Sequence, residues 1–370
     1  MLLVYLVILI LHLPGIINSV SFTTLHCSSM WWPYRESWGG LLNCALFITL
    51  SALTIFNFVS ALFKGPGYLP LKWKPENEND TQYMQYCSVC QGFKAPRSHH
   101  CRKCNRCVLK MDHHCPWINT CVGHLNHGNF TAFLLWAVLG CAQACVVLSC
   151  SLYCAVNRTW YLYYGNGTEP VVQLGLYMFT LCIFSLGLSC GVMLSVSMLL
   201  YFQVKSILKN QTGIEDWIIE KANARRDGST FIYPYNLGWR ENWKQVVNWS
   251  CTPLGDGIHW PVQEGCHEYT LTIEQQKQKN EKRQRTRLYT VVRSFSGWWL
   301  PIVHGWKVFC SPPCLDEARL KLDVNDNVRV TRWRKHWLFG EKEGQEKRMR
   351  GWFPRVCVVE VTEHKEHKTQ

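Results

Sequence analysis

Cysteine and histidine are concentrated between Cys87 and Cys121, in a pattern that could bind metal or activate a thiol. Seven of the chain's 20 cysteines fall in this segment. A Cys-x2-Cys pair lets two thiolates reach one ion across a tight turn, and repeated pairs with interleaved histidine are typical of tetrahedral zinc sites. The clustering therefore predicts metal binding or catalysis rather than a disulfide scaffold.

Two closed zinc sites need eight ligands, and the segment supplies that number. The candidate ligands are Cys87, Cys90, His100, Cys101, Cys104, Cys107, His114 and Cys121. Asp112, His113 and Cys115 then remain, and they could form an activated nucleophile: an imidazole takes the thiol proton and a carboxylate orients the imidazole. The alternative is a binding-only zinc module in which these three are further ligands or their neighbours. Spacing alone leaves both open.

Long apolar blocks on both sides of this segment would hold it at a membrane. Each block lacks Lys, Arg, Asp and Glu, and each reaches or approaches the roughly 20 residues that a helix needs to cross the hydrocarbon core. The four blocks are residues 2–20, 41–63, 130–156 and 171–204. The first could instead be a cleaved signal peptide, leaving three spans. We expect a retained span, preceded by a short lead-in that this sequence lacks.

The distribution of Lys and Arg predicts the orientation of the spans. Residues 64–129 hold nine of the 39, residues 205–370 hold 28, and each of the other two loops holds one. The basic regions 64–129 and 205–370 stay in the cytosol. With an even number of spans, both termini are expected there as well. The net charge of +13 is then a topology signal rather than a sign of nucleic-acid binding. Part of it could contact anionic lipid or the phosphates of a nucleotide cofactor.

The cysteine-rich segment resembles the signature of the zinc-DHHC protein S-acyltransferases. The matching pattern runs from Cys87 to Phe130 and reads Cys-x2-Cys-x9-His-Cys-x2-Cys-x2-Cys-x4-Asp-His-His-Cys-x5-Cys-x4-Asn-x3-Phe. The resemblance implies ping-pong transfer of an acyl group from palmitoyl-CoA through Cys115, with His113 as the proton shuttle and Asp112 orienting it. It also implies an interleaved ligand pairing, with one Zn²⁺ on Cys87, Cys90, His100 and Cys107 and the other on Cys101, Cys104, His114 and Cys121.

Two further motifs extend the resemblance beyond the last span. Thr212 and Glu215 resemble the family's Thr-Thr-x-Glu motif, but Gly213 replaces the second threonine, which puts its contact to the active site in doubt. Locally, Thr-x-x-Glu predicts a capping box that starts a helix. Asn242 matches an asparagine that would brace the catalytic loop. For the acyl chain, we expect Trp117, Phe130 and Phe133 as lining residues; ordinary interfacial aromatics are the alternative.

The last third of the chain predicts a linker and a small β-barrel. Residues 271–288 indicate a linker, or else a solvated helix. Short strands with turn residues between them follow, and Trp337 with Gly351 to Pro354 resembles a Src-homology-3 (SH3) domain. Such a domain could bind proline-rich ligands through Trp337 and Pro354, or could be purely structural. Candidate S-acylation sites in this part are Cys310, Cys314 and Cys357.

We therefore predict an integral membrane α-helical protein with four transmembrane helices, a cytosolic two-zinc domain and a C-terminal SH3-like barrel. The expected parts are 1–63 (spans one and two), 64–129 (zinc domain), 130–204 (spans three and four), 205–270 (cytosolic motifs), 271–288 (linker), 289–362 (SH3-like domain) and 363–370 (tail).

The resemblance implies a protein S-palmitoyltransferase of the endoplasmic-reticulum membrane, with the Golgi as the alternative. Expected partners are the bilayer, acyl-CoA, membrane-associated proteins with cytosolic cysteines, and an accessory protein or upstream acyltransferase, but not nucleic acid. The competing functions are a non-enzymatic membrane-anchored zinc/SH3 scaffold and a zinc-loop ubiquitin ligase. The ligase would need no nucleophilic Cys115.

Overall fold

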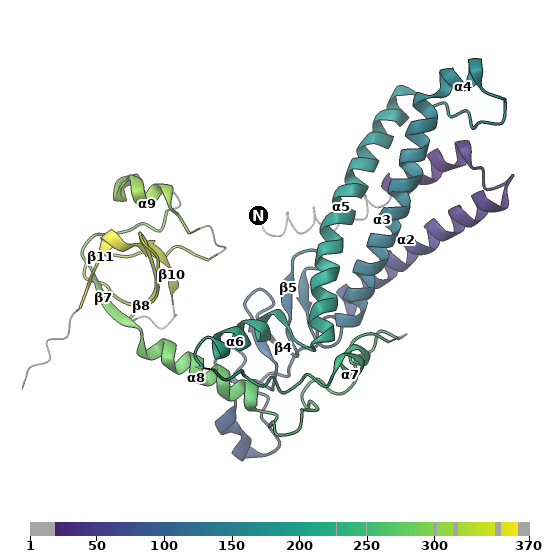
Figure 1. The fold of residues 1–370 in the computed structure, drawn as a ribbon. Coiled ribbons are helices and arrows are strands. Elements are labelled where there is room, and N and C mark those ends of the chain that lie inside the picture. Colours follow the sequence, from purple (N-terminus) through teal and green to yellow (C-terminus); the bar gives the residue numbers. More distant parts are fainter. Residues whose placement is uncertain are drawn as a thin grey trace, which may run out of the picture. The chain divides into compact units, whose positions relative to one another are not determined.

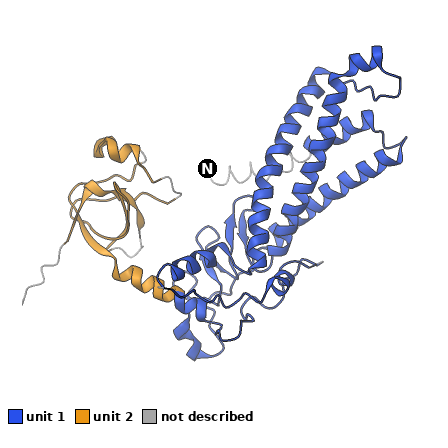
Figure 2. Cartoon of the chain, in the orientation of Figure 1, with its two compact units in different colours: residues 1–274 blue, residues 275–370 orange. Residues whose placement is uncertain are grey.

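The chain forms two compact units, Met1–Glu274 (unit 1) and Gln275–Gln370 (unit 2), in a computed structural model (Figure 2). The described residues are 19–226, 228–248, 250–298, 302–313, 317–344 and 349–361. The predicted first span, residues 2–20, falls almost wholly outside them, as do Cys314 and the tail 363–370. Residues 19–31 are helical.

Three long apolar helices dominate unit 1 (Figure 1): α2 (Trp38–Lys64), α3 (His127–Val156) and α5 (Leu176–Leu208). Among the described residues, these are the helices long and apolar enough to cross a membrane. Helix α3 packs against both α2 and α5. The predicted blocks 41–63 and 130–156 lie within α2 and α3. The block 171–204 is shifted, because α5 begins only after Gly175 and continues to Leu208.

Polar side chains join the helices across their apolar faces. The Gln143 amide donates to Asn43 Oδ1 at 2.9 Å, and the Asn129 amide donates to Asn57 Oδ1 at 3.1 Å. Lys64, in the last turn of α2, donates to Asn129 Oδ1 at 2.9 Å. Hydrogen bonds of this kind hold apolar helices together in lipid, where the hydrophobic effect gives no preference for helix contact over lipid contact.

The cysteine-rich segment folds as three two-stranded antiparallel hairpins. They pair β1 (Tyr86–Cys87) with β2 (Gly92–Phe93), β3 (His99–Cys101) with β4 (Arg106–Val108), and β5 (His113–Cys115) with β6 (Thr120–Val122). A short 3-10 helix, η1 (Glu78–Tyr83), precedes them. Gln91, Asn105 and Asn119 have positive φ angles of 53°, 53° and 49°. These left-handed residues let each hairpin turn tightly close to its potential metal ligands.

Shorter helices and extended segments complete unit 1. Helix α4 (Arg158–Tyr164) follows α3, and α6 (Gly213–Asn223) and α7 (Trp239–Lys244) follow α5. The predicted capping box is confirmed: the Thr212 side chain accepts from Glu215 N, and the Glu215 side chain accepts from Thr212 N. A small core of Ile218, Ala222 and Tyr235 packs α6 against the extended segment beyond it.

Unit 2 contains a five-stranded antiparallel sheet in the order β10-β9-β8-β7-β11. Its strands are β7 (Arg287–Val291), β8 (Asn327–Trp333), β9 (Trp337–Lys342), β10 (Arg350–Pro354) and β11 (Val358–Glu360), with η2 (Ile302–His304), α9 (Trp306–Cys310) and η3 (Arg355–Cys357) between them. The sheet is strongly curled (Figure 1). Its core includes Trp337, Phe353 and Leu322.

The segment expected as a linker is a helix, α8 (Thr270–Gln284). Its first turn buries Leu271 and Glu274, and the remainder is rich in Gln, Lys and Arg. The structure therefore shows a helix where the sequence left open a linker or a solvated helix near anionic lipid.

Candidate active site and metal centres

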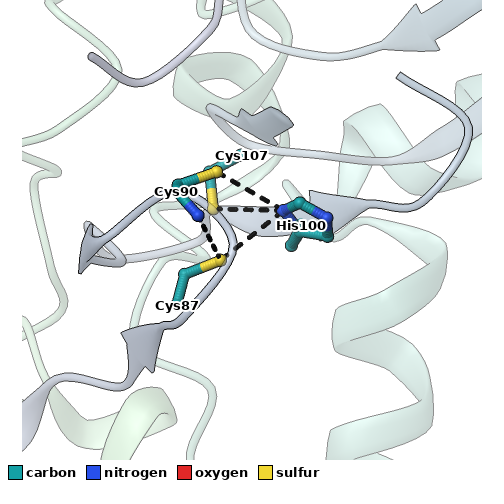
Figure 3. A group of neighbouring side chains, drawn as sticks. All are labelled: Cys87, Cys90, His100 and Cys107. Atoms are coloured by element: carbon teal, nitrogen blue, oxygen red, sulfur yellow. Dashed lines mark hydrogen bonds between the residues drawn. The ribbon is translucent and has the colours of Figure 1, made fainter. Parts of the chain in front are cut away.

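The first ligand group brings Cys87, Cys90, His100 and Cys107 together (Figure 3). The His100 Nδ1 atom lies 3.5 Å from Cys87 Sγ, 3.5 Å from Cys90 Sγ and 3.9 Å from Cys107 Sγ. Zinc bonds of about 2.3 Å to sulfur and about 2.0 Å to nitrogen place tetrahedral ligands roughly 3.5–3.8 Å apart. The four side chains therefore fit one Zn²⁺.

The second group consists of Cys101, Cys104, His114 and Cys121. Here His114 Nδ1 lies 3.6, 3.4 and 3.7 Å from the three sulfurs, and Cys104 Sγ lies 3.6 Å from Cys121 Sγ. These distances also fit a tetrahedral zinc site. The structure thus assembles the same two sets of four that the family resemblance implied.

Strand geometry explains the interleaving of the two groups. His100 and Cys101 are neighbours in β3, and successive side chains of a strand point to opposite faces. His100 therefore joins one group and Cys101 the other. The register of the hairpins adds a second ligand to each histidine, because His100 pairs with Cys107 and His114 pairs with Cys121.

Asp112, His113 and Cys115 lie beside the second group. Asp112 is buried, and its Oδ2 accepts a hydrogen bond from His113 Nδ1 at 2.8 Å. Burial raises the pKa of Asp112, but the hydrogen bonds from His113 and Gly213 outweigh it and hold the pKa below its usual value. Burial lowers the pKa of His113, but Asp112 and the hydrogen bond with Cys115 raise it to about 9. The site therefore favours a proton on the imidazole beside the thiol.

Gly213, which stands where the family motif has a second threonine, contacts Asp112. Its backbone N–H donates to Asp112 Oδ1 at 2.9 Å, so this position contacts the active site through its main chain. Gly213 is the first residue of α6, whose first backbone N–H groups have no partner within the helix. Such a position suits a carboxylate.

Cys115 faces an apolar cluster at the meeting point of the three long helices. The cluster that contains Cys115 also contains Phe58 and Ala61 of α2, Phe130 and Leu134 of α3, and Ile118 and Val122. Phe133 of α3 and Val196 and Leu200 of α5 pack against it. Phe130 also contacts the His113 ring, with centroids 5.6 Å apart. Phe130 and Phe133 belong to or pack against the cluster that contains Cys115, and their role as lining residues stays a prediction. Trp117 is 51% exposed and does not belong to this cluster.

A buried ion pair that sequence analysis missed fastens α6 to the cysteine-rich segment. Arg97 Nε lies 2.7 Å from Glu215 Oε1, and both side chains are fully buried. Arg97 also donates to Asn210 and Tyr233, and lies between the rings of Tyr235 and Trp260, 4.6 Å from each centroid. Glu215 thus serves both the capping box and this pair.

Replacing Arg97 by methionine is expected to destabilise unit 1 by about 3–5 kcal/mol, because Glu215 would stay buried without a countercharge. The measurement is chemical denaturation in detergent. Lys244→Met, which breaks the exposed pair with Glu241, is the control and should change little. The double variant Arg97→Met/Glu215→Met should lose less than Arg97→Met alone. Equal effects of Arg97→Met and the control would contradict this account.

Asn242 is fully buried and supports the segment that follows α5. Its amide donates to Leu208 O at 2.8 Å and to Asn236 Oδ1 at 2.7 Å, and its Oδ1 accepts from Leu237 N at 3.0 Å. These bonds reach the end of α5 rather than the catalytic loop. That Asn242 braces the catalytic loop therefore stays a prediction. Any such effect would be transmitted through α5.

Burial in unit 2 bears on an alternative that the sequence left open, the binding of proline-rich ligands, and on one of the expected S-acylation sites. Trp337 is fully buried, donates to Val308 O at 3.1 Å, and so presents no surface to a proline-rich ligand; Pro354 is buried too. Cys357 is also fully buried, and burial raises its pKa to about 11, so S-acylation there is wrong for the folded unit. Cys310 is exposed and stays a prediction, while Cys314 lies outside the described residues.

The long apolar helices and the zinc-capable cysteine-rich region define a membrane protein of one class. Residues 80–220 match the family model described as DHHC palmitoyltransferase, and the chain belongs to that family.

Relatives of known name agree with this assignment. The chain is 45% identical to Palmitoyltransferase ZDHHC6 of Homo sapiens, over 93% of this chain and 88% of the relative. It is 46% identical to Palmitoyltransferase ZDHHC6 of Danio rerio, over 90% and 87% respectively. It is 31% identical to Probable protein S-acyltransferase 16 of Arabidopsis thaliana, over 62% of this chain and 83% of the relative.

Proposed function

We propose that this chain is a protein S-palmitoyltransferase that moves a long-chain acyl group from palmitoyl-CoA to cysteine thiols of membrane-associated proteins. One observation carries the proposal. Cys115 lies beside an imidazole that is hydrogen bonded to a buried carboxylate, within an apolar cluster where three membrane-length helices meet. The relatives' names supply the substrate class.

In the first half of the reaction, His113 accepts the Sγ proton of Cys115. The thiolate attacks the thioester carbonyl of palmitoyl-CoA, and the bond between that carbon and the CoA sulfur breaks. The CoA thiolate leaves with the proton that His113 returns. The raised pKa of His113 favours the thiolate–imidazolium pair that starts this step.

In the second half, a protein thiol approaches the acylated Cys115. His113 accepts the proton of the incoming thiol, the new thiolate attacks the same carbonyl, and the Cys115 sulfur leaves and is reprotonated. One thioester replaces another at each step, so catalysis consists mainly of making thiolate and placing the reactants.

The apolar cluster suits the acyl chain. Each buried methylene contributes about 0.8 kcal/mol, so a long chain strongly favours a site between apolar helices. Phe130 and Phe133 of α3 are the proposed lining residues. Trp117, exposed next to the catalytic strand, is proposed for the membrane interface, where tryptophan concentrates.

Two Zn²⁺ ions are the proposed structural cofactors, one on each group of four ligands. Bound zinc would rigidify the hairpins that carry Asp112, His113 and Cys115, which preorganised catalysis requires. All eight ligand side chains are used in these two groups, so Cys115 is left as a free thiol.

The proposed membrane arrangement has four spans with both termini in the cytosol, in the endoplasmic reticulum. The three described apolar helices and the apolar block 2–20 support the number of spans. The basic residues of 64–129 and 205–370 support the orientation. The compartment is proposed from the resemblance of the segment order to the SH3-bearing member of the family.

Unit 2 is proposed to be an SH3-like barrel with a structural or regulatory role. The curled five-stranded antiparallel sheet and its own hydrophobic core support the fold. Burial of Trp337 beneath Val308 of α9 supports a role other than the binding of proline-rich peptides. Exposed Cys310 is the proposed point of contact with an upstream acyltransferase.

The test is to incubate the purified protein in detergent with radiolabelled palmitoyl-CoA. Label should survive denaturation, be released by neutral hydroxylamine as a thioester is, and map to the peptide that contains Cys115. Protein that retains zinc but gains no such label would support the scaffold alternative instead.

A further inference from the structure

Asp112 receives a third hydrogen bond, which comes from the membrane helices. Gln203, near the end of α5, donates from Nε2 to Asp112 Oδ2 at 2.9 Å. On its other side, Gln203 Oε1 lies 2.8 Å from Nε2 of His127, the first residue of α3. All three side chains are buried, with exposed fractions of 7%, 9% and 4% for Asp112, Gln203 and His127.

The donor and acceptor groups of His127, Gln203 and Asp112 determine the direction of both hydrogen bonds that join these three side chains. An ionised carboxylate only accepts, so the Gln203 amide must turn its NH₂ toward Asp112. Its carbonyl oxygen then faces His127, and His127 Nε2 must carry the hydrogen that it donates. The order is therefore His127 to Gln203 to Asp112, which leaves no freedom to flip the amide without losing both bonds.

These bonds determine the plane of the Asp112 carboxylate. His113 Nδ1 and Gln203 Nε2 both reach Oδ2, while Gly213 N reaches Oδ1. The three donors come from β5, α5 and α6, so the carboxylate is held from three directions. Without Gln203, Oδ2 would keep only its contact to His113, and the pair could rotate together away from Cys115.

We propose that Gln203, held by His127, is a positioning residue for acyl transfer: it fixes Asp112 so that His113 presents its second ring nitrogen to Cys115. The inference rests on the proposed function, which it deepens. It assigns a role in the chemistry to two polar residues within helices that otherwise serve to cross the membrane.

The test compares Gln203→Met with Gln143→Met. Gln143 is a matched control, because its amide also bridges two apolar helices, through Asn43, but has no contact with Asp112. The measurements are single-turnover acylation of Cys115 by palmitoyl-CoA, transfer to a thiol acceptor, KM for palmitoyl-CoA, and bound zinc.

Gln203→Met is expected to slow acylation by about 10–100-fold, the range typical of groups that orient a functional side chain. KM should stay within about two-fold, since the contact is to a carboxylate and not to the donor. Gln143→Met should leave the acylation rate near wild type. His127→Phe, which leaves the amide present but unanchored, should give a smaller slowing in the same direction.

A double-variant cycle separates positioning from general damage. If Gln203 acts through Asp112, then Gln203→Met should add little to the loss caused by Asp112→Asn. Full additivity, or equal effects of Gln203→Met and Gln143→Met, would overturn the proposal. If Gln203→Met loses zinc, the same measurements on His127→Phe test the proposal instead: slowed acylation supports it, and a wild-type rate overturns it. Absence of acyl-enzyme in the wild type would instead overturn the proposed function, so the two failures are distinguishable.

Discussion

Replacement of Cys115 by serine is expected to abolish both the acyl-enzyme and acyl transfer, while the fold and the bound zinc are retained. A serine hydroxyl is far less acidic than a thiol, so His113 cannot generate a comparable nucleophile from it. In enzymes where a nucleophile and its base act as a unit, loss of the nucleophile alone costs on the order of 10⁶-fold in kcat. The measurement is label transfer from palmitoyl-CoA in single-turnover and steady-state assays.

The matched control for this change is Cys154→Ser, which replaces a buried cysteine of α3 outside both ligand groups. It should keep wild-type activity. Zinc content should be two ions per chain in both variants. Residual hydroxylamine-sensitive label at the position of the catalytic peptide in Cys115→Ser, or loss of zinc from it, would contradict the assignment of Cys115 as a free nucleophile.

Loss of one zinc ligand is expected to unfold the hairpins and to eliminate activity by a different route. In Cys104→Ala, the second group keeps three ligands, and its metal should be released. The energy of metal binding is folding energy in small zinc modules, so the hairpins β3–β4 and β5–β6 should lose their structure with it. The measurements are metal content, protease sensitivity of residues 87–121, and label on Cys115.

Removal of zinc by a chelator should reproduce the effect of Cys104→Ala in the wild type. Both groups share the run His99–Cys107, so loss of one ion should weaken the other, and bound zinc should fall below one ion per chain. A variant that keeps one full equivalent of zinc and wild-type acylation would contradict this coupling.

Local sequence patterns predicted the parts of this structure that depend on neighbouring residues. Residues 41–63 and 130–156 are helical, because long apolar runs without charge have few other solutions. The capping box at Thr212 was predictable for the same reason: both partners lie within one turn. Helix α5 starts late because Gly175, with an extended backbone, marks its N-cap.

Contacts over long sequence separations were out of reach of such patterns. The partners Arg97 and Glu215 are 118 positions apart, and Gln203 and Asp112 are 91 apart. Arg97 looked like one more basic loop residue. Gln203 did offer a signal, since an amide within an apolar helix needs a partner, but the sequence could not say which.

The ligand pairing likewise combines a part that local patterns predict with a part that depends on the folded structure. Cysteine and histidine spacing predicted eight ligands, yet the assignment of each to a site depends on which strand faces which. Only the hairpin register, with His100 opposite Cys107 and His114 opposite Cys121, brings the groups together. Trp337 is a similar case, because an aromatic residue of a small sheet can be a ligand platform or part of the core, and here it is core.

The main-chain donor at Gly213 has a consequence for how this position can vary. A backbone N–H is present whatever the side chain, and a Cβ built there would meet only Asp112 Oδ1, at 3.9 Å. Alanine, serine or threonine should therefore be silent. Proline alone abolishes the donor, although it suits the first turn of a helix, and Thr212 already has the extended backbone that a following proline prefers. Small side chains should therefore be tolerated at this position, whereas proline should impair the enzyme because it removes the hydrogen-bond donor to Asp112.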